Sequence, residues 1–537
     1  MKRRKHIRGR HANAADREAV ASLLEGLPLG REGLLAALHR VNDCHGCLLE
    51  GALVALAERL GLSVAEVFEV ASFYHHFSIT EAADGRPILR VCDSIVCEMH
   101  GAEALLSTLQ TKFGDTLRIE RAPCMGRCAH PPVATLEQQP IENATPEKID
   151  SALRAEQAEI ATTTPADYRQ ISQLVERGDR DTLTETITQS GLRGMGGAGF
   201  PTGRKWQLVR QHDGPRLMVV NIDEGEPGTF KDRFLLETAL HRCIEGALIA
   251  AWAVEAEAVH FYLRDEYADC RRALEKALAN LQADPPCPLP QLHLHRGAGA
   301  YVCGEESALI ESIEGKRGMP RLRPPYIAEQ GMFGRPTLAH NLETLYWVAE
   351  TTERGADFFR QAGRNGRHGL RHFSLSGRVK NPGVYLAPAG ISLRELIDEY
   401  GGGMADGHQL KAYFPGGAAG GILPASLADV PLDFDTLQPH GCFIGSAAVM
   451  VLSDQDSVKQ AVLNALRFFA DESCGQCTPC RSGTVRTVEL LSQPQPDGAL
   501  LEALAQVMQD ASICGLGQAA PNPFLCLLRY FPEEVAS

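Results

Sequence analysis

Apolar residues recur at three- and four-residue intervals in the first part of the chain, as Leu53, Leu56 and Leu60 do. This spacing places apolar side chains on one face of a helix. We therefore predict that residues 17–79 form helices, and that a helical region occupies about residues 1–85.

Short apolar runs replace this pattern from residue 87 onward. The runs at 88–92, 117–120 and 133–136 predict strands, with a helix at 102–113 between the first two. The result is a compact β-α-β-β unit, assigned to residues 86–160. The stretch 138–168 is rich in Glu, Ala and Thr and is expected to be a linker helix and domain boundary.

Longer alternation of strands and helices follows and predicts an α/β domain over 165–365. Strands are expected at 217–221 and 258–262, and a helix at 181–189. The most apolar stretch, 243–263, contains Glu245, Glu255 and Glu257. Charged residues are costly in a membrane, so this stretch is expected to be a buried helix and not a membrane span.

Two further units complete the expected architecture, a multi-domain α/β protein. Strand patterns at 372–378 and 383–386 and a helix pattern at 393–400 predict a small β-grasp-like unit over 366–453. Helical patterns surround the last cysteines, so residues 454–537 are expected to form a helical bundle.

Composition narrows the function classes. The 537 residues carry 53 basic and 67 acidic side chains, a net charge of −14, which argues against nucleic acid as the main partner. Residues 1–10 are basic but lack the apolar stretch of a signal peptide, so they are interpreted as a solvated arm. We expect a cytoplasmic protein with no membrane partner. In that compartment its 16 cysteines fit ligand roles better than disulfides.

Four cysteines near the C-terminus have spacing typical of an iron–sulfur site: Cys474, Cys477, Cys480 and Cys514. Three thiolates at every third position can hold three corners of a [4Fe–4S] cluster, with a distant cysteine at the fourth. Gly475, Gly515 and Gly517 would let backbone N–H groups approach the sulfurs. Tetrahedral zinc is the alternative, although zinc sites usually present two separated cysteine pairs.

A second set combines Cys92 and Cys97 after one predicted strand with Cys124 and Cys128 after another. The four-residue gap in the first pair is typical of a [2Fe–2S] site, although the second pair departs from the plant-type arrangement. Disulfides or zinc are the alternatives. The motif Cys44-x2-Cys47 has no second pair to complete a site; a redox-active dithiol is one interpretation, and incidental cysteines are favoured.

Glycine-rich and acidic segments predict a ligand site. The glycines that match G-x-G-x-x-G are Gly194, Gly196, Gly197 and Gly199. A helix pattern precedes them instead of a strand, so an ordinary Rossmann site is disfavoured, while a loop that contacts a phosphate or a flat ring remains open. Acidic residues follow the strand at 217–221 and recur in 297–306. Carboxylates at a strand's end can accept hydrogen bonds from ribose or ribityl hydroxyls.

These segments resemble a known family. Segments 190–203, 221–233, 297–306 and 472–481 are similar to the NADH-oxidising flavoprotein subunit of respiratory complex I and its soluble relatives, over about residues 170–537. Residues 20–140, with Cys92, Cys97, Cys124 and Cys128, look like the thioredoxin-like [2Fe–2S] subunit of the same systems. The resemblance implies FMN, NAD(H), one [4Fe–4S] and one [2Fe–2S] cluster, with FMN linking single electrons to hydride transfer.

The resemblance also implies site residues. Those expected to hold FMN are Gly194, Gly196, Gly197, Gly199, Lys205, Asn221, Asp223, Glu224, Tyr301, Gly304, Asn341 and Thr344. Those expected to meet the nicotinamide nucleotide are Phe200, Glu226, Glu306, Arg323 and Tyr326, and Glu305 and His340 complete the cofactor-binding set. This chain departs from the complex I branch at Met195, His340, Arg323 and Tyr326, where arginine, asparagine, lysine and phenylalanine are common.

Fused subunits of this kind occur in soluble NAD-reducing hydrogenases and in soluble molybdenum-containing formate dehydrogenases. Segments 335–347, 420–426 and 433–445 look closest to the formate dehydrogenase beta subunit. That resemblance implies a molybdenum-containing alpha subunit, a small [2Fe–2S] gamma subunit and a higher-order oligomer. A hydrogenase diaphorase or the complex I module is the alternative, and a zinc-stabilised interaction scaffold is the alternative of a different class.

Overall fold

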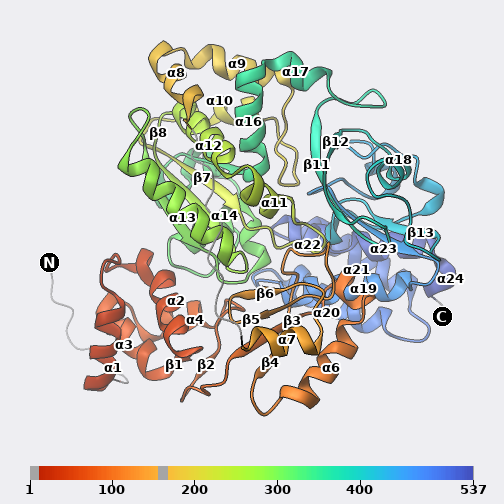
Figure 1. The fold of residues 1–537 in the computed structure, drawn as a ribbon, viewed down its shortest axis with the longest axis horizontal. Coiled ribbons are helices and arrows are strands. Elements are labelled where there is room, and N and C mark those ends of the chain that lie inside the picture. The colour runs from red at the N-terminus through yellow and green to blue at the C-terminus, as the bar shows by residue number, and fades with distance from the viewer. Residues whose placement is uncertain (1–10, 155–166, 536–537) are drawn as a thin grey trace.

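The computed structural model describes residues 11–154 and 167–535, so the basic segment 1–10 lies outside the described residues. The N-terminal region is helical, as the periodicity predicts, and forms the red lobe of Figure 1. Ser63 and Glu66 form a reciprocal capping box at the start of the fourth helix. The helices are α1 (Ala14–Leu23), α2 (Leu34–His45), α3 (Glu50–Leu60) and α4 (Val64–Ala71), and the short strands β1 (Leu48–Leu49) and β2 (Ile79–Thr80) pair in parallel.

A four-stranded sheet of order β4-β3-β5-β6 follows. β3 (Ile88–Cys92) pairs in parallel with β4 (Arg118–Ala122) and antiparallel with β5 (Ala134–Leu136). α5 (Ile95–Met99) and α6 (Ala102–Phe113) lie between β3 and β4 in the chain. The predicted β-α-β-β unit is present.

The expected linker helix over 138–168 is wrong for the first part of that stretch. β6 (Gln139–Ile141) pairs antiparallel with β5, and α7 (Pro146–Ala152) buries Ile149. Composition indicated a linker because these elements are short and mostly polar, yet each contributes one apolar side chain to the core of the unit. Residues 155–166 lie outside the described residues.

A wholly parallel sheet of order β10-β7-β8-β9 forms the centre of the next domain. One face, with Val220 and Phe261, packs against the helices, and the other, with Val219 and Tyr262, joins a separate core. Its strands are β7 (Arg216–Ile222), β8 (Ala256–Leu263), β9 (Gln291–Arg296) and β10 (Thr337–Asn341). The helices are α8 (Arg169–Arg177), α9 (Arg180–Ser190), α10 (Thr202–Arg210), α11 (Lys231–Thr238), α12 (Leu240–Val254), α13 (Ala268–Ala283), α14 (Glu306–Ile313), α15 (Ile327–Gln330), α16 (Leu342–Arg354) and α17 (Ala356–Gln361).

The buried helix expected over 243–263 covers only the first part of that stretch, and the strand expected at 258–262 is present in β8. α12 is buried along most of its length but ends at Val254, because Glu255 adopts a left-handed conformation with φ of 57°. The chain then continues as β8. A left-handed residue ends a helix, and its position is not visible in an apolar run.

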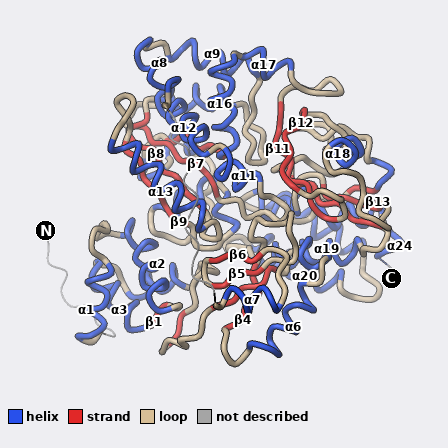
Figure 2. Tube along the Cα trace, in the orientation of Figure 1, coloured by secondary structure: helices blue, strands red, loops and turns tan. Residues whose placement is uncertain are grey.

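A mixed five-stranded sheet of order β12-β11-β15-β13-β14 occupies the region expected to be β-grasp-like. Figure 2 shows it apart from the parallel sheet. Its elements are β11 (Leu370–Gly377), β12 (Gly383–Pro388), α18 (Leu393–Glu399), β13 (Leu410–Phe414), β14 (Leu423–Pro424) and β15 (Ala448–Ser453). The C-terminal helices are α19 (Val458–Asp471), α20 (Thr478–Leu491), α21 (Gly498–Ala511), α22 (Gly515–Ala519), α23 (Asn522–Tyr530) and α24 (Pro532–Val535).

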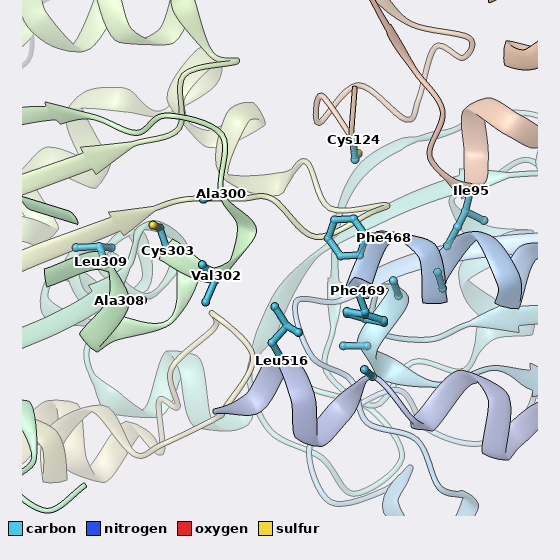
Figure 3. Close-up of a cluster of buried hydrophobic side chains, with 14 of the residues drawn as sticks. Ile95, Cys124, Ala300, Val302, Cys303, Ala308, Leu309, Phe468, Phe469 and Leu516 are labelled. Carbon is cyan, nitrogen blue, oxygen red and sulfur yellow. The ribbon is translucent and has the colours of Figure 1, made fainter. Parts of the chain in front are cut away.

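One apolar cluster joins these parts of the chain (Figure 3). Ile95 and Cys124 come from the front sheet unit, Val302 from the α/β domain, and Phe469 and Leu516 from the C-terminal helices. Because buried packing holds side chains in fixed positions, the cysteine-bearing loops and the α/β domain are held at a defined mutual distance. Among the described residues, no helix is long and apolar enough to cross a membrane.

Candidate functional site

The acidic segment begins where two neighbouring parallel strands end. Asn221 near the end of β7 is in register with Asn341 at the end of β10. Asn221 donates from Nδ2 to the Gly304 carbonyl at 2.8 Å, and Asn341 caps the N-terminus of α16 by accepting from the Glu343 N–H. Two side chains and one backbone carbonyl from three predicted site segments therefore meet at the carboxyl edge of the sheet, where α/β proteins bind ligands.

The glycine-rich loop lies against this edge, between helices α9 and α10, as the non-Rossmann interpretation requires. The Met195 N–H donates to Thr344 Oγ1 at 2.9 Å. A side chain at Gly196 would place Cβ 3.0 Å from the Asn341 side chain, and Gly199 has a φ of 64° and faces the Phe434 ring. The loop thus presents bare backbone beside Asn341, which fits close approach by a flat ligand.

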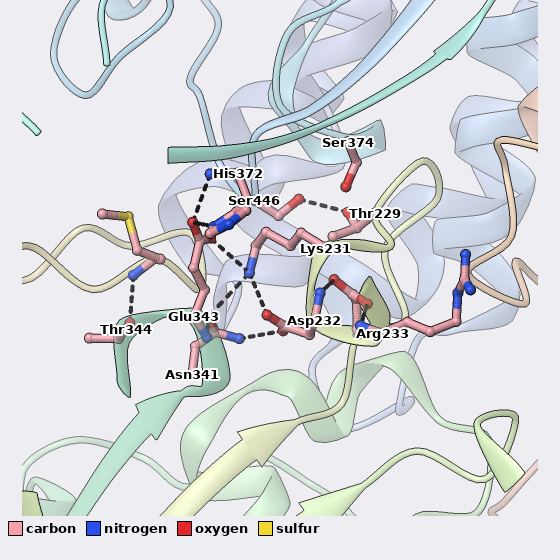
Figure 4. Close-up of polar contacts among 12 residues, drawn as sticks. Thr229, Lys231, Asp232, Arg233, Asn341, Glu343, Thr344, His372, Ser374 and Ser446 are labelled. Carbon is pink, nitrogen blue, oxygen red and sulfur yellow. Dashed lines mark hydrogen bonds and ion pairs between the residues drawn. The ribbon is translucent and has the colours of Figure 1, made fainter. Parts of the chain in front are cut away.

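A buried charge network lies behind Asn341 (Figure 4). The Lys231 ammonium contacts Asp232 Oδ1 at 2.7 Å, Glu343 Oε2 at 3.2 Å and Asn341 Oδ1 at 3.1 Å. Asn341 in turn donates to Asp232 Oδ2 at 2.6 Å. Lys231 and Asp232 therefore fix which way the Asn341 amide points. Sequence reasoning gave them no role, although both stand in the segment 221–233 that carries the family resemblance.

The carboxyl of Asp223 has an unmet hydrogen-bonding capacity. Its Oδ2 atom is buried without a hydrogen-bond partner, and burial holds the pKa of this carboxyl well above its usual range. A buried acceptor of this kind calls for a donor such as a ligand hydroxyl. The polyhydroxyl chain of FMN supplies such donors, so the residues at this strand edge fit that group.

Glu224 and Glu226 have different surroundings. Glu224 is buried and accepts from the Asp232 and Arg233 N–H groups and from the Tyr267 hydroxyl, so it is turned away from the loop edge. Glu226 accepts from the Tyr301 hydroxyl at 2.8 Å and the Ala419 N–H at 2.7 Å. Burial raises the pKa of each carboxyl to about 7.

Tyr301 is engaged by the protein and does not present a free face. Its ring packs against Phe468 with centroids 5.0 Å apart, and its N–H donates to Glu472 Oε2 at 2.8 Å. Glu472 lies two residues before Cys474. Tyr301 therefore connects Glu226 to the segment that carries the C-terminal cysteines.

The remaining predicted residues form the rim. Lys205 contacts Glu306 at 2.9 Å and donates to the Ala339 carbonyl, and Arg323 pairs with Glu305 and lies 3.7 Å from Glu306. Glu305 also caps α14 by accepting from two backbone N–H groups. The aromatic residues of the rim are exposed, Phe200 at 45% and Tyr326 at 58%.

His340 does not join this group. Side chains alternate along a strand, so His340 points to the opposite face of β10 from Asn341. There it accepts from the Trp206 indole N–H at 2.9 Å, and burial holds the pKa of its imidazole well below the usual range. The structure gives the His340 side chain a protein partner on that face, and its expected cofactor contact stays a prediction.

The four C-terminal cysteines converge on one small cavity, lined also by Val302, Pro320 and Leu516. Cys477 and Cys514 stand at the N-caps of α20 and α22, and Cys480 lies in the first turn of α20. The N–H groups of Leu516 and Gly517 donate toward the Cys514 sulfur, although burial still raises the pKa of its thiol to about 11. This donor set fits a cluster of iron and sulfide, which binds thiolates.

The glycines near this cavity act differently from one another. Gly475 adopts a φ of 76°, in the left-handed region that favours glycine. A side chain at Gly517 would place Cβ 2.8 Å from the Cys480 Cβ. A side chain at Gly515 would meet open space. The Gly517 backbone thus lies close to Cys480, and the expected approach of backbone at Gly515 stays a prediction.

The second cysteine set is wholly buried. The Cys124 and Cys128 sulfurs are 3.3 Å apart, and hydrogen bonds from Cys128 and Cys92 hold the pKa of the Cys124 thiol well below its usual range. Cys92 also hydrogen-bonds with Cys97. All four side chains thus converge, and Gly126, with a φ of 66°, turns the chain between two of them.

Cysteines outside these sets include one unpredicted contact. Cys442 and Cys526 have buried sulfurs 3.5 Å apart. Cys44 is exposed, whereas Cys47 is buried and accepts from the Thr80 hydroxyl. These positions show no convergence of Cys44 or Cys47 with the cluster cysteines.

Two features outside the site could be mistaken for it. A cavity of about 930 Å³ opens at the amino ends of β7 and β8, the opposite end from the acidic segment. His39, His76 and Asp265 bring possible metal-ligand atoms within 4.8 Å of one another. Both Asp265 oxygens are already engaged, one by His76 and one by Arg296, so this group is explained as a buried ion-pair network.

Comparison with known proteins defines the class: an NADH-linked flavin and iron–sulfur oxidoreductase subunit. Residues 187–350 match the Nuo51 FMN-binding domain and residues 20–157 the thioredoxin-like [2Fe-2S] ferredoxin family. Residues 460–537 match the NADH-ubiquinone oxidoreductase-F iron-sulfur binding region and residues 373–423 the SLBB domain.

Relatives define the family. One F-type subunit of the NADH-quinone oxidoreductase of Rhizobium meliloti (strain 1021), numbered F 2, is 40% identical over 382 residues, 68% of this chain and 91% of the relative. The corresponding F-type protein of Streptomyces coelicolor is 42% identical over 66% of this chain and 82% of the relative. The chain belongs to the family of F-type subunits of NADH-quinone oxidoreductase.

Its fold is also similar to a solved structure of an NAD+-reducing [NiFe]-hydrogenase in the H2-reduced state. That match has a TM-score of 0.83 and 34% identity, and it covers 95% of this chain and 93% of the hydrogenase chain. The expected fold class and the cofactors FMN, NAD(H), [2Fe–2S] and [4Fe–4S] are confirmed. Structural zinc at the C-terminal cysteines is not supported, because that region matches an iron–sulfur family.

Proposed function

We propose that the chain is the diaphorase subunit of a soluble NAD-linked formate dehydrogenase and exchanges electrons between NAD(H) and iron–sulfur clusters. Bound FMN supplies the conversion between hydride transfer and single-electron transfer. The observation that carries the proposal is the double attachment of Tyr301. Its hydroxyl donates to Glu226 of the acidic segment and its N–H donates to Glu472, beside the cluster cysteines.

The chain's own residues bind and orient. Asn221, Asp223, Asn341 and Thr344 would hold FMN at the strand edge, with the backbone of the glycine loop against it. Fixed dipoles and charges at such a site need no rearrangement during electron exchange. Acid–base catalysis by a side chain is not required, since the electrons move through the flavin.

The nicotinamide nucleotide would lie over the rim. Phe200 and Tyr326 offer exposed rings, and Arg323 and Lys205 offer cations for its phosphates. Both cations already pair with Glu305 and Glu306, so nucleotide binding would compete with these ion pairs. Glu305 and Glu306 offset the charge of these cations, and their carboxylate oxygens can also accept hydrogen bonds from ribose hydroxyls.

The cluster ligands would be Cys474, Cys477, Cys480 and Cys514 for [4Fe–4S], and Cys92, Cys97, Cys124 and Cys128 for [2Fe–2S]. Convergence of each set on one point supports this assignment. The purified holoprotein should then contain about six iron atoms and one FMN per chain. Zinc in place of iron, without acid-labile sulfide or flavin, would refute the proposal.

Formate as the electron source is supported by three segments, 335–347, 420–426 and 433–445. Two of them lie at the predicted flavin site: the first contains Asn341 and Thr344, and in the third Phe434 faces Gly199 while Asp435 pairs with Arg193 at 2.6 Å. The expected partners are a molybdenum-containing alpha subunit and a small [2Fe–2S] gamma subunit in a cytoplasmic, higher-order complex.

A hydrogenase diaphorase is the second candidate, favoured by the likeness to the NAD+-reducing hydrogenase over 95% of this chain. The intact complex separates the two. NAD+ reduction driven by formate, with molybdenum in the partner subunit, supports the proposal. Reduction driven by hydrogen alone, with nickel in the partner, assigns the chain to a hydrogenase.

A further inference from the structure

Two arginines of the flavin domain reach into the loop that carries Cys124 and Cys128. Arg264 follows β8 and donates from Nη2 to the Cys124 carbonyl at 2.6 Å. Arg233 of α11 donates from Nε to the Gly126 carbonyl at 2.9 Å. Figure 4 shows Arg233 extending away from the Lys231 network. The cysteine loop of one domain is thus held by cations of another.

Arg264 also connects this loop to the acidic segment. Its Nη1 donates to the Glu224 carbonyl, and its Nε contacts Glu266 at 3.0 Å. The guanidinium lies over the Tyr267 ring, 5.1 Å from its centroid, and the residue is 3% exposed. All three guanidinium nitrogens therefore have partners, and the group has no freedom to turn toward solvent.

The position of this charge matters for the cluster. A [2Fe–2S] cluster with four thiolates gains one negative charge on reduction, and nearby charge is among the factors that set its potential. A buried cation acts on that charge more strongly than an exposed one, because solvent screens it less. The Arg264 guanidinium donates to the Cys124 carbonyl, so its charge lies beside a residue that would bind the cluster.

We propose that Arg264 is a positioning residue that fixes the Cys124 loop against the flavin domain and raises the reduction potential of the [2Fe–2S] cluster. Glu266 opposes it by partly offsetting the cation. The inference rests on the proposed ligand role of Cys124. It makes the potential of the front cluster a property of the flavin domain as well as of its own four cysteines.

Arg233 differs from Arg264 in how its charge is neutralised by a carboxylate and in which residue of the cysteine loop it contacts. It pairs with Glu237 through contacts of 2.7 and 3.0 Å, and it donates to the carbonyl of Gly126, which is not a ligand. Its effect on the potential should therefore be smaller. Arg264 is the residue to test.

The test is a redox titration of the full-length holoprotein, followed by electron paramagnetic resonance of the reduced [2Fe–2S] signal. Arg264→Gln should lower its midpoint potential, and Glu266→Gln should raise it. Arg264→Lys keeps the charge and should stay closer to the wild type than Arg264→Gln. General loosening of the fold would not shift the midpoint potential in opposite directions for two neighbouring residues.

Arg271→Gln is the matched control. Arg271 donates to Gln138 across the same junction but does not contact the cysteine loop in the described hydrogen bonds. A midpoint in Arg264→Gln equal to that of Arg271→Gln, with the signal intact, overturns the inference. If Arg264→Gln does not fold, the test rests on Glu266→Gln. An unchanged or lower midpoint potential in Glu266→Gln then overturns the inference. Persistence of the signal in Cys124→Ser would instead refute the ligand assignment.

Discussion

Removing the Lys231 ammonium should destabilise the flavin domain strongly. The Lys231 side chain is 1% exposed and lies between Asp232 and Glu343, which are 3% and 1% exposed. Lys231→Met would leave two carboxylates buried without their cation. Breaking a buried ion pair by removing one partner costs about 3–5 kcal/mol. An exposed pair contributes about 0–1 kcal/mol.

The exposed pair Lys380–Asp406 provides the matched control, because its N–O distance is 2.9 Å and its side chains are 48% and 93% exposed. Urea unfolding of the cofactor-loaded chain, followed by flavin fluorescence, would report the difference. With a slope of roughly 1–3 kcal/mol/M, Lys231→Met should lower the midpoint by about 1 M or more, and Lys380→Met by far less.

Charge removal from the carboxylates tests the cause. Adding Asp232→Asn and Glu343→Gln to Lys231→Met should recover part of the lost stability, because the buried negative charges are then gone. The reasoning is refuted if Lys231→Met unfolds at the same urea concentration as Lys380→Met. It is also refuted if neutralising the carboxylates lowers the midpoint further.

Three further outcomes are expected. Cys514→Ser should abolish the [4Fe–4S] resonance and retain the [2Fe–2S] resonance, with Cys128→Ser giving the converse; survival of both signals would refute the assignment. Asp223→Ala should weaken FMN binding about 2–10-fold in a flavin fluorescence titration, as expected for one hydrogen bond to a neutral carboxyl; unchanged affinity would contradict it. Because burial raises the pKa of Glu224 to about 7, this carboxyl alone should cost the flavin-free chain about 3 kcal/mol of stability between pH 4.5 and 7, in addition to the loss from Glu226. Glu224→Gln should flatten that profile in urea titrations at each pH, and an unaltered slope would exclude Glu224 as its source.

Local patterns allowed most elements to be predicted. The strand at 217–221 is the centre of β7, and the helix at 181–189 is α9, because each carries its own apolar periodicity. The cluster cysteines were visible for a related reason: ligands on one short loop have a spacing that the chemistry itself restricts. The glycine loop was correctly separated from a Rossmann site by what precedes it.

Contacts between distant segments were not predictable in this way. Lys231 and Glu343 are 112 positions apart, and their pairing depends on how α11 and α16 meet beneath the sheet edge. Cys442 and Cys526 meet only because the mixed sheet packs on α23. The Trp206 contact of His340 was not predictable either, because a family position gives the residue type, whereas strand alternation decides which face the side chain occupies.

The front region is an integral part of the site and not a tethered module. The Rhizobium meliloti relative matches 68% of this chain, and the front region matches a separate thioredoxin-like family. Domains joined this way usually move relative to one another unless their interface is large and apolar. Here separation would expose the apolar cluster shared by Cys124 and Phe469 and leave the Arg264 donors without the Cys124 carbonyl. Both costs oppose separation, so the [2Fe–2S] loop should keep one position relative to the flavin edge.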